Sequence, residues 1–139
     1  MTRYLVVANQ TLISDELLEK VAERLRHEDC CFHLLVPATP LPRNGTWTDG
    51  KARSLAGQRL EHALKRFADL GAEVTGEVGD ANPMAAVADS MRSAPCAGII
   101  LATLPPGKSA WLRQDLPSRV ARKFGVPVDH VVAHRVLEA

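Results

Sequence analysis

Residues 99–119 read I-I-L-A-T-L-P-P-G-K-S-A-W-L-R-Q-D-L-P-S-R. An apolar run over residues 98–102 stops at a proline–glycine turn, and basic and hydroxyl residues follow before a new helical pattern begins. This order predicts a buried strand that leads through a loop into a helix. Because ligands of open α/β sheets bind at loops beyond the carboxyl ends of strands, this loop is the first candidate for a functional site.

Apolar runs and amphipathic stretches alternate along the rest of the chain. We expect strands at residues 3–8, 31–36, 73–78, 98–102 and 128–133, and helices at residues 12–28, 52–70, 83–91 and 116–124. Residues 37–50 hold three prolines and two glycines and are expected to form a loop. The alternation predicts one α/β domain over residues 1–139, a doubly wound parallel sheet of five strands between two layers of helices.

Residues that suit helix ends support these boundaries. Ser14 and Asn82 are residue types that cap helix N-termini, and Pro83 stands at the first helical position after Asn82. Gly71 and Gly125 each follow the end of an expected helix, where a left-handed backbone commonly closes the last turn.

The composition is that of an ordinary globular chain. Of its 139 residues, 46% are hydrophobic and 24% charged, with a net charge of +1, which gives no signal for nucleic acid or an acidic membrane surface. No apolar run approaches the roughly 20 residues of a membrane helix, and the short apolar N-terminus is interpreted as a strand rather than a signal peptide. We expect a cytoplasmic protein without nucleic-acid or membrane partners.

Cysteines and histidines give no pattern typical of a metal site or a disulfide framework. The number of cysteines is odd, two of them are adjacent, and no C-x-x-C occurs. We interpret the cysteines as small buried side chains in a reducing compartment, and we expect no metal. The residues concerned are Cys30, Cys31, Cys96, His27, His33, His62, His130 and His134.

With its five strands and four helices, the chain resembles the universal stress protein family. Gly79-Asp80 just after the third expected strand and the x-P-V start of the last strand at residues 126–128 carry the resemblance, which covers residues 3–133. It is closest to divergent actinobacterial-type members with L-P-P-G-x-S-x-W-L-R-x-D-L-P, here residues 104–117. The resemblance implies the strand order 3-2-1-4-5.

The chain departs from the pattern of the ATP-binding members of that family. They carry an Asp after the first strand, where Asn9 stands, and G-x-x-G followed later by G-[ST] after the fourth. Gly107 matches the second of these glycines, but Leu104 replaces the first and Gln114-Asp115 replaces the Gly-Ser/Thr. Such glycines let phosphates approach backbone N–H groups. We therefore expect no family-type ATP binding and no cofactor.

Neither a nucleotide-hydrolysing loop nor another catalytic arrangement is favoured. Residues 102–109 fit a relaxed P-loop pattern, but Pro105 and Pro106 have no N–H to offer a phosphate. The chain has no G-x-S-x-G motif and suggests no Cys, His and acid set. We expect the protein not to be an enzyme.

A ligand site remains an alternative. In a sheet of order 3-2-1-4-5, the loops after the first and fourth strands face each other at the switch point. They would supply hydroxyl and amide groups, and Lys108 and Arg113 for an anion, so ATP, another nucleotide or a small anionic ligand could bind between them. The candidate ligand-binding residues are Asn9, Gln10, Thr11, Val36, Gly79, Asp80, Thr103, Pro105, Gly107, Lys108, Ser109, Arg113 and Gln114.

The same loop also has a purely structural interpretation. Its prolines would stiffen the turn, Trp111 would pack it onto the sheet, and Asp115 would pair with Arg113 and Arg119 at the surface. Trp47, in the earlier loop, is likewise interpreted as packing rather than binding a partner. A stiff turn and a weak ligand site are compatible.

The last strand would lie at a sheet edge, with an apolar centre and no lysine to guard it. The resemblance implies dimerisation through this strand, and the candidate interface residues are Val126, Val128, His130, Val131, Val132 and Ala133. Our first hypothesis for function is a non-enzymatic, homodimeric cytoplasmic regulator or adaptor with an unidentified protein partner. The alternative is a sensor for a nucleotide or small anion.

Overall fold

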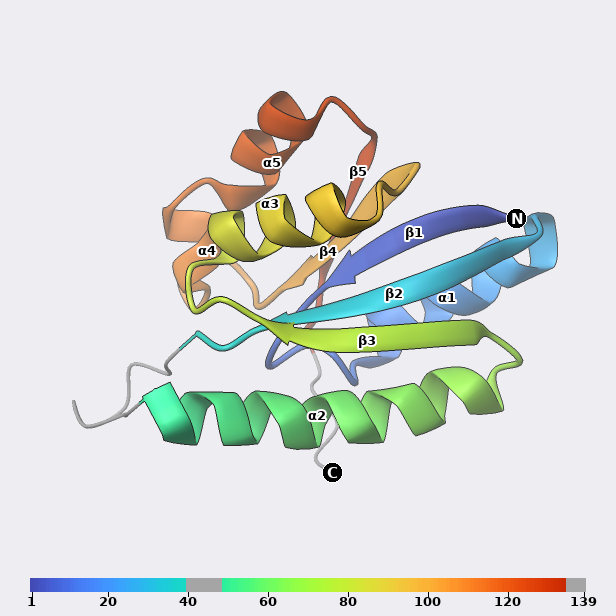
Figure 1. Cartoon of the computed structure of the whole chain (residues 1–139), viewed down its shortest axis with the longest axis horizontal. Coiled ribbons are helices and arrows are strands. Elements are labelled where there is room, and N and C mark those ends of the chain that lie inside the picture. The colour runs from blue at the N-terminus through green and yellow to red at the C-terminus, as the bar shows by residue number, and fades with distance from the viewer. Residues whose placement is uncertain (40–48, 135–139) are drawn as a thin grey trace.

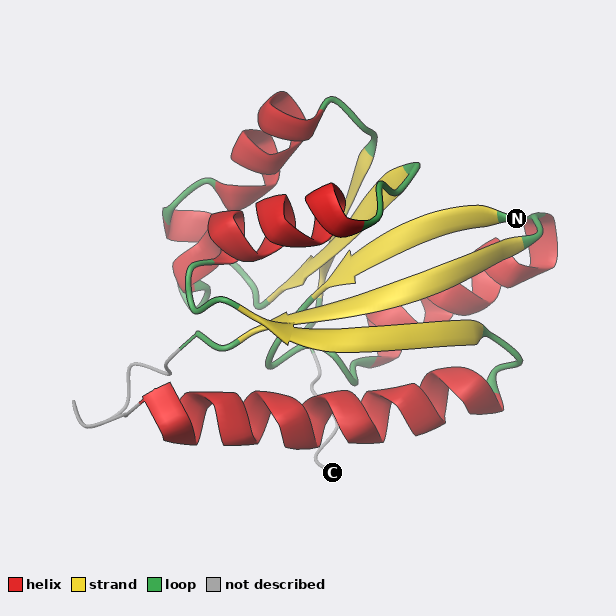
Figure 2. Ribbon diagram, viewed as in Figure 1, coloured by secondary structure: helices red, strands yellow, loops and turns green. Residues whose placement is uncertain are grey.

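The computed structural model describes residues 1–39 and 49–134. Its five strands are parallel and have the order β3-β2-β1-β4-β5, which confirms the expected topology. Figures 1 and 2 show helices on both sides of a twisted sheet. The elements are β1 (Thr2–Val7), α1 (Asp15–His27), β2 (Cys30–Pro37), α2 (Asp49–Asp69), β3 (Glu73–Gly79), α3 (Pro83–Ser93), β4 (Gly98–Thr103), α4 (Ala110–Arg113), α5 (Leu116–Phe124) and β5 (Val128–Val132).

Alternate residues of each strand face opposite sides of the sheet and so build two separate cores. Tyr4 and Val6 of β1 belong to the core that packs under α1 and α2, whereas Leu5 and Val7 belong to the core under α3 and α5. Figure 1 shows the same division, with α3 and α5 on one side of the sheet and α1 on the other.

β4 is the most completely buried strand of the sheet. All six residues of β4 are buried, because β4 lies between β1 and β5 and is covered on both faces. A strand in that position reads as a continuous apolar run rather than an alternating one. The predicted buried strand is therefore confirmed.

The predicted helix caps are present. Ser14 Oγ accepts a hydrogen bond from the Leu17 N–H at 3.3 Å. Asn82 Oδ1 accepts from the Met84 N–H at 2.9 Å and also from Ala85. Gly125 has a left-handed backbone, with φ of 64°, directly after α5. These contacts satisfy N–H groups that have no partner within the helix itself.

Several element boundaries differ from the expected ones. The helix expected from residue 12 begins at Asp15, because the Ser14 side chain caps it there. The expected loop 37–50 ends earlier, since α2 already begins at Asp49. Residues 40–48, Trp47 among them, lie outside the described residues. None of the helices in the described parts of the chain is long and apolar enough to cross a lipid bilayer.

The loop expected at residues 103–114 contains a helical turn, α4, that the sequence analysis missed. Ser109 Oγ caps it by accepting from the Leu112 N–H at 3.2 Å. Trp111 is only 8% exposed, which confirms its predicted packing role. Asp115, with φ of 55°, separates α4 from α5. Four residues are too few for a helical period to be visible in a sequence.

A polar cluster joins α1 to the sheet. Tyr4 Oη donates to Glu28 at 2.7 Å and accepts from Arg24 at 2.9 Å, while the guanidinium group of Arg24 lies 4.7 Å from the Tyr4 ring centre. Burial, helped by the Glu28 carboxylate, raises the pKa of Tyr4. Arg24 also forms an ion pair with Asp129, which ties the edge strand β5 to α1.

Candidate functional site

A pocket lies at the switch point of the sheet, beyond the carboxyl ends of β1 and β4. About 490 Å³ of space that no atom occupies lies inside it, open solvent included. The loop after β4, the first candidate for a functional site, therefore borders a pocket. The residues that line the pocket are Asn9, Gln10, Thr11, Thr39, Ala102, Thr103, Leu104, Lys108, Ser109, Ala110 and Trp111.

The structure brings together some of the predicted ligand-binding residues and leaves others apart. The loops after β1 and β4 do line one pocket, as the strand order required. The candidates in its lining are Asn9, Gln10, Thr11, Thr103, Lys108 and Ser109. The candidates outside its lining are Val36, Gly79, Asp80, Pro105, Gly107, Arg113 and Gln114.

Three of the candidates outside the lining have clear structural roles. Val36 is fully buried in the core under α1 and α2. Gly79 packs so closely against α3 that an added Cβ would crowd it. Asp80 accepts a hydrogen bond from the Asn82 N–H at 2.8 Å, so its carboxylate holds the turn before α3 rather than facing the pocket.

The other four shape or follow the turn after β4. The Lys108 N–H donates to the Pro105 carbonyl at 3.0 Å, and Gly107 has φ of 88°, a conformation that favours glycine. This turn brings Lys108 to the pocket wall. Arg113 and Gln114 are exposed at the end of α4, outside the pocket lining.

The predicted surface ion pairs around Asp115 are not formed. Among the described residues, no ion pair joins Asp115 to Arg113 or Arg119. Arg119 donates instead to the carbonyl of Gln114 at 3.4 Å. Exposed charges gain little from pairing, so charge proximity in the sequence is a weak guide here.

Thr39 belongs to the pocket although the sequence analysis did not select it. It follows β2, which lies next to β1 in the sheet, so its loop reaches the same edge as the loop after β1. Trp111, which was selected only for packing, also lines the pocket. Thr39 could have been selected because, in the expected strand order, the loop after the second strand lies next to the loop after the first.

Asn9 lines the pocket and forms hydrogen bonds through both ends of its side-chain amide. Its Nδ2 donates to the Pro37 carbonyl at 2.8 Å, and its Oδ1 accepts from Arg59 of α2. The residue is 7% exposed. A carboxylate at this position could not donate to Pro37, so Asn9 joins the end of β2 to α2 in a way an aspartate would not.

Hydroxyl groups in the lining make hydrogen bonds within the protein. Thr11 Oγ1 donates to the Ala102 carbonyl at 2.9 Å, and Thr39 Oγ1 donates to a carbonyl in the loop after β3 at 2.9 Å. Thr103 Oγ1 donates to the Leu104 carbonyl at 2.9 Å. These bonds fix the loops around the pocket before any ligand arrives.

Lys108 provides the charge of the site. It is the only charged residue among the described residues that line the pocket. No aspartate or glutamate lies in that lining, and the described residues contain no group of three or more side chains suited to hold a metal ion. The arrangement favours a ligand with one anionic group over a metal-chelated polyphosphate.

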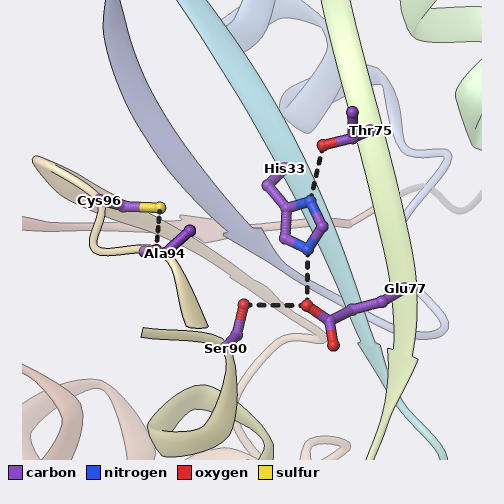
Figure 3. A network of polar contacts seen from close by, with 6 residues as sticks. All are labelled: His33, Thr75, Glu77, Ser90, Ala94 and Cys96. Carbon is purple, nitrogen blue, oxygen red and sulfur yellow. Dashed lines mark hydrogen bonds and ion pairs between the residues drawn. The ribbon is translucent and has the colours of Figure 1, made fainter. Parts of the chain in front are cut away.

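A second polar network lies away from the pocket, between β2, β3 and α3 (Figure 3). The ring nitrogens of His33 contact Thr75 Oγ1 at 2.7 Å and Glu77 Oε2 at 2.6 Å. Ser90 donates to the same Glu77 oxygen at 3.1 Å. The network joins the edge strand β3 to β2 and α3.

The thiol groups of two cysteines are shielded. Cys30 and Cys96 are buried, and all three cysteines are free. Burial raises the pKa of both Cys30 and Cys96, so they hold their protons more firmly than an exposed thiol does. Cys96 Sγ donates to the Ala94 carbonyl at 3.7 Å (Figure 3). The sequence-based interpretation of these two residues as buried is confirmed.

β5 is an edge strand, as predicted, but one candidate interface residue is unavailable. Val126, Val128, Val131 and Val132 are half-buried and His130 is exposed. By contrast, Ala133 is fully buried, and its N–H donates to the β4 carbonyl at residue 103 at 2.8 Å. The sequence pattern could not show that the last apolar residue turns inward.

Solved structures share this architecture. A universal stress protein family protein from Arabidopsis thaliana with AMP bound aligns at a TM-score of 0.66 and 12% identity, covering 96% of this chain and 93% of that one. A universal stress protein from Archaeoglobus fulgidus aligns at 0.65 and 18% identity, covering 94% and 93%. One in complex with cAMP aligns at 0.57 and 17% identity, covering 96% and 97%.

No protein-family model matches the sequence, and no curated protein matches it. The doubly wound sheet with a pocket at its switch point is an architecture that commonly holds small ligands. The solved structures specify it further: the chain has the universal stress protein fold.

Proposed function

We propose that this chain is a non-enzymatic sensor that binds a nucleotide of low charge, such as AMP or cAMP, in the pocket between the loops after β1 and β4. The single observation that carries the proposal is the pocket itself, with Lys108 as its one charged lining residue among those described. Two structural neighbours hold AMP and cAMP, which supports the choice of ligand class.

The lining argues against Mg²⁺-ATP as the ligand. A triphosphate needs several charge-compensating groups and is normally held with a metal that carboxylates help to position. Among the described residues of the lining, Lys108 alone supplies a positive charge and none carries a carboxylate. Two of the glycines that allow close backbone approach in ATP-binding members are also replaced, by Leu104 and Gln114.

The proposal includes homodimerisation through β5 in the cytoplasm. β5 is an edge strand of the sheet, its valines are half-buried, and the strand contains no lysine. Edge strands of this kind pair readily with another chain. A purely protein-binding adaptor is the second candidate function, and the same exposed edge is the observation that favours it. The two candidates differ in whether the pocket holds a ligand.

Isothermal titration of the purified chain with AMP, cAMP, adenosine and Mg²⁺-ATP tests the proposal. We expect AMP or cAMP to bind more tightly than Mg²⁺-ATP. Lys108→Ala should weaken the binding of AMP by about tenfold or more, because a charge-assisted hydrogen bond is lost. The affinity for adenosine, which has no phosphate, should stay unchanged.

Lys65→Ala is the matched control, since Lys65 is exposed on α2 and outside the pocket lining. It should bind AMP as the unmodified chain does. If none of the four compounds binds at millimolar concentration, the sensor proposal is wrong and the adaptor hypothesis takes its place.

A further inference from the structure

Three threonine hydroxyl groups of the pocket lining already donate their only proton in hydrogen bonds within the protein. Thr11, Thr39 and Thr103 each donate it to a backbone carbonyl at 2.9 Å. A hydroxyl group has one proton to donate and two lone pairs to accept with. A ligand that reaches these oxygens therefore meets acceptors.

His130 holds Thr103 in this state. The imidazole Nε2 lies 2.8 Å from Thr103 Oγ1. Because the hydroxyl proton goes to the Leu104 carbonyl at 2.9 Å, the hydrogen bond to His130 requires Nε2 to be the donor, an assignment that follows from the network. Thr103 Oγ1 then keeps one lone pair for a further donor.

Donor groups come from a different part of the lining. Lys108 carries an ammonium group that only donates. Ser109 Oγ accepts from the Leu112 N–H at 3.2 Å, and no hydrogen bond from its own proton to another described residue is formed, so that proton is available. Both donors lie on one turn after β4, whereas the acceptors come from the ends of three strands, β1, β2 and β4.

We propose that Thr11, Thr39 and Thr103 determine specificity by selecting ligands with hydroxyl or amino donors, while Lys108 takes a single anionic group. The inference rests on the proposed function and narrows its ligand class to a phosphorylated compound with a hydroxyl-bearing body. Phosphate oxygens against these three threonines would place lone pair against lone pair, so the anionic group of a ligand belongs at Lys108 and its hydroxyl groups belong at the threonines.

The test compares three probes on the full chain by isothermal titration: AMP, 2′,3′-dideoxy-AMP and inorganic phosphate. AMP keeps the ribose hydroxyl donors that the dideoxy compound lacks. We expect the dideoxy compound to bind about tenfold or more weakly than AMP, because buried acceptors lose their partners. Inorganic phosphate, which can contact Lys108 but brings no ribose hydroxyls to the threonines, should bind at least tenfold more weakly than AMP.

Paired variants assign the effect to the threonines. Thr11→Val, Thr39→Val and Thr103→Val remove the acceptor with little change in shape, whereas the corresponding Ser variants keep it. At least one Val variant should lose most of the difference between AMP and its dideoxy analogue, and its Ser partner should retain it. The melting temperature without ligand shows which variants are folded and enter the comparison.

The outcomes separate this inference from the proposed function. Equal affinities for AMP and 2′,3′-dideoxy-AMP in the unmodified chain overturn the inference and leave the nucleotide site standing. Inorganic phosphate that binds as tightly as AMP overturns it as well, because the threonines would then contribute nothing to affinity. Failure of AMP, cAMP and adenosine to bind at all contradicts the proposed function, and the inference with it.

Discussion

At the scale of single residues, the site is organised by side chains that bind the protein before they could bind a ligand. Asn9 spans two elements, with one end of its amide on the Pro37 carbonyl and the other on Arg59. The threonines of the lining bond to nearby carbonyls in the same way. A pocket built like this is largely preformed, which lowers the entropic cost of ligand binding.

Replacing Asn9 should therefore cost stability. Asn9→Ala removes the donor to the buried Pro37 carbonyl and one acceptor for Arg59, and we expect a loss of about 1–3 kcal/mol in the free energy of unfolding. Urea denaturation measures it. Gln10→Ala is the control, since Gln10 is half-buried and no side-chain hydrogen bond joins it to another described residue; a similar loss in both variants would contradict the role given to Asn9.

His130 should make stability depend on pH. Partial burial lowers its pKa from the ordinary value of 6.5, so the unfolded chain takes up this proton at a higher pH than the folded chain does. The contribution to stability is complete above about pH 6.5, falls as the pH drops below that value, and levels off below the lowered folded pKa.

The measurement compares unfolding free energies of the unmodified chain and His130→Gln between pH 8 and pH 5. Gln has no titrating group, and its amide can still donate to Thr103 Oγ1. We expect the unmodified chain to lose stability relative to the variant on acidification. A relative gain on acidification would show that the folded chain favours the protonated imidazole instead.

At the scale of elements, the sequence was most informative where one feature acts locally. The caps Ser14 and Asn82 bond to N–H groups two or three residues away, and the buried run of β4 is continuous in the chain. Such signals can be recognised without the rest of the fold. The single turn α4 could not, because it depends on a cap at Ser109 and on the burial of Trp111.

Glycines in different elements should respond oppositely to alanine. In Gly79→Ala the new Cβ would lie 2.7 Å from Leu35 Cδ1 and 2.9 Å from Ala86 Cβ, and we expect a loss of about 1–3 kcal/mol from overpacking. Gly57, within α2, has nothing within 4 Å of an added Cβ. Gly57→Ala should stabilise the chain by roughly 0.5–1 kcal/mol. Thermal or urea unfolding of both variants checks the contrast, and effects of the same sign would refute it.

At the scale of the whole molecule, the two sheet edges differ. Glu73 and Glu77 lie on the side of β3 that faces α3, and in an antiparallel pair of two such strands centred on Thr75 they would stand opposite each other and repel. β5 carries the half-buried Val128 and Val132 instead. We therefore expect a second copy to pair at β5 rather than at β3.

We predict that the chain is a homodimer at tens of micromolar and that Val132→Lys makes it a monomer. The Ala133 N–H points to β4, so by the alternation of a strand the N–H of Val132 points away from the sheet and toward a partner. A lysine there discourages edge pairing. Light scattering after size exclusion gives the mass, with Val132→Thr as the control that should remain dimeric. A monomeric mass for the unmodified chain would rule out this dimer.

The sequence by itself was enough to predict the α/β class, the strand–helix alternation and the region of the site, while the resemblance supplied the strand order. The physical reason is that period-two and helical apolar patterns, caps and turns are encoded over a few neighbouring residues. Local patterns placed Lys108 and Ser109 in the loop after β4, and the strand order implied by the resemblance placed that loop at the switch point; both residues line the pocket.

The tertiary structure alone decided how the site is built. Thr39 joins the pocket because β2 lies beside β1. Ala133 is fully buried, although the sequence pattern placed it at an exposed edge. The bond from His130 to Thr103 joins residues 27 positions apart. Contacts of this kind depend on where distant segments pack against one another, and no local pattern in the chain specifies which hydroxyl proton a distant carbonyl will take.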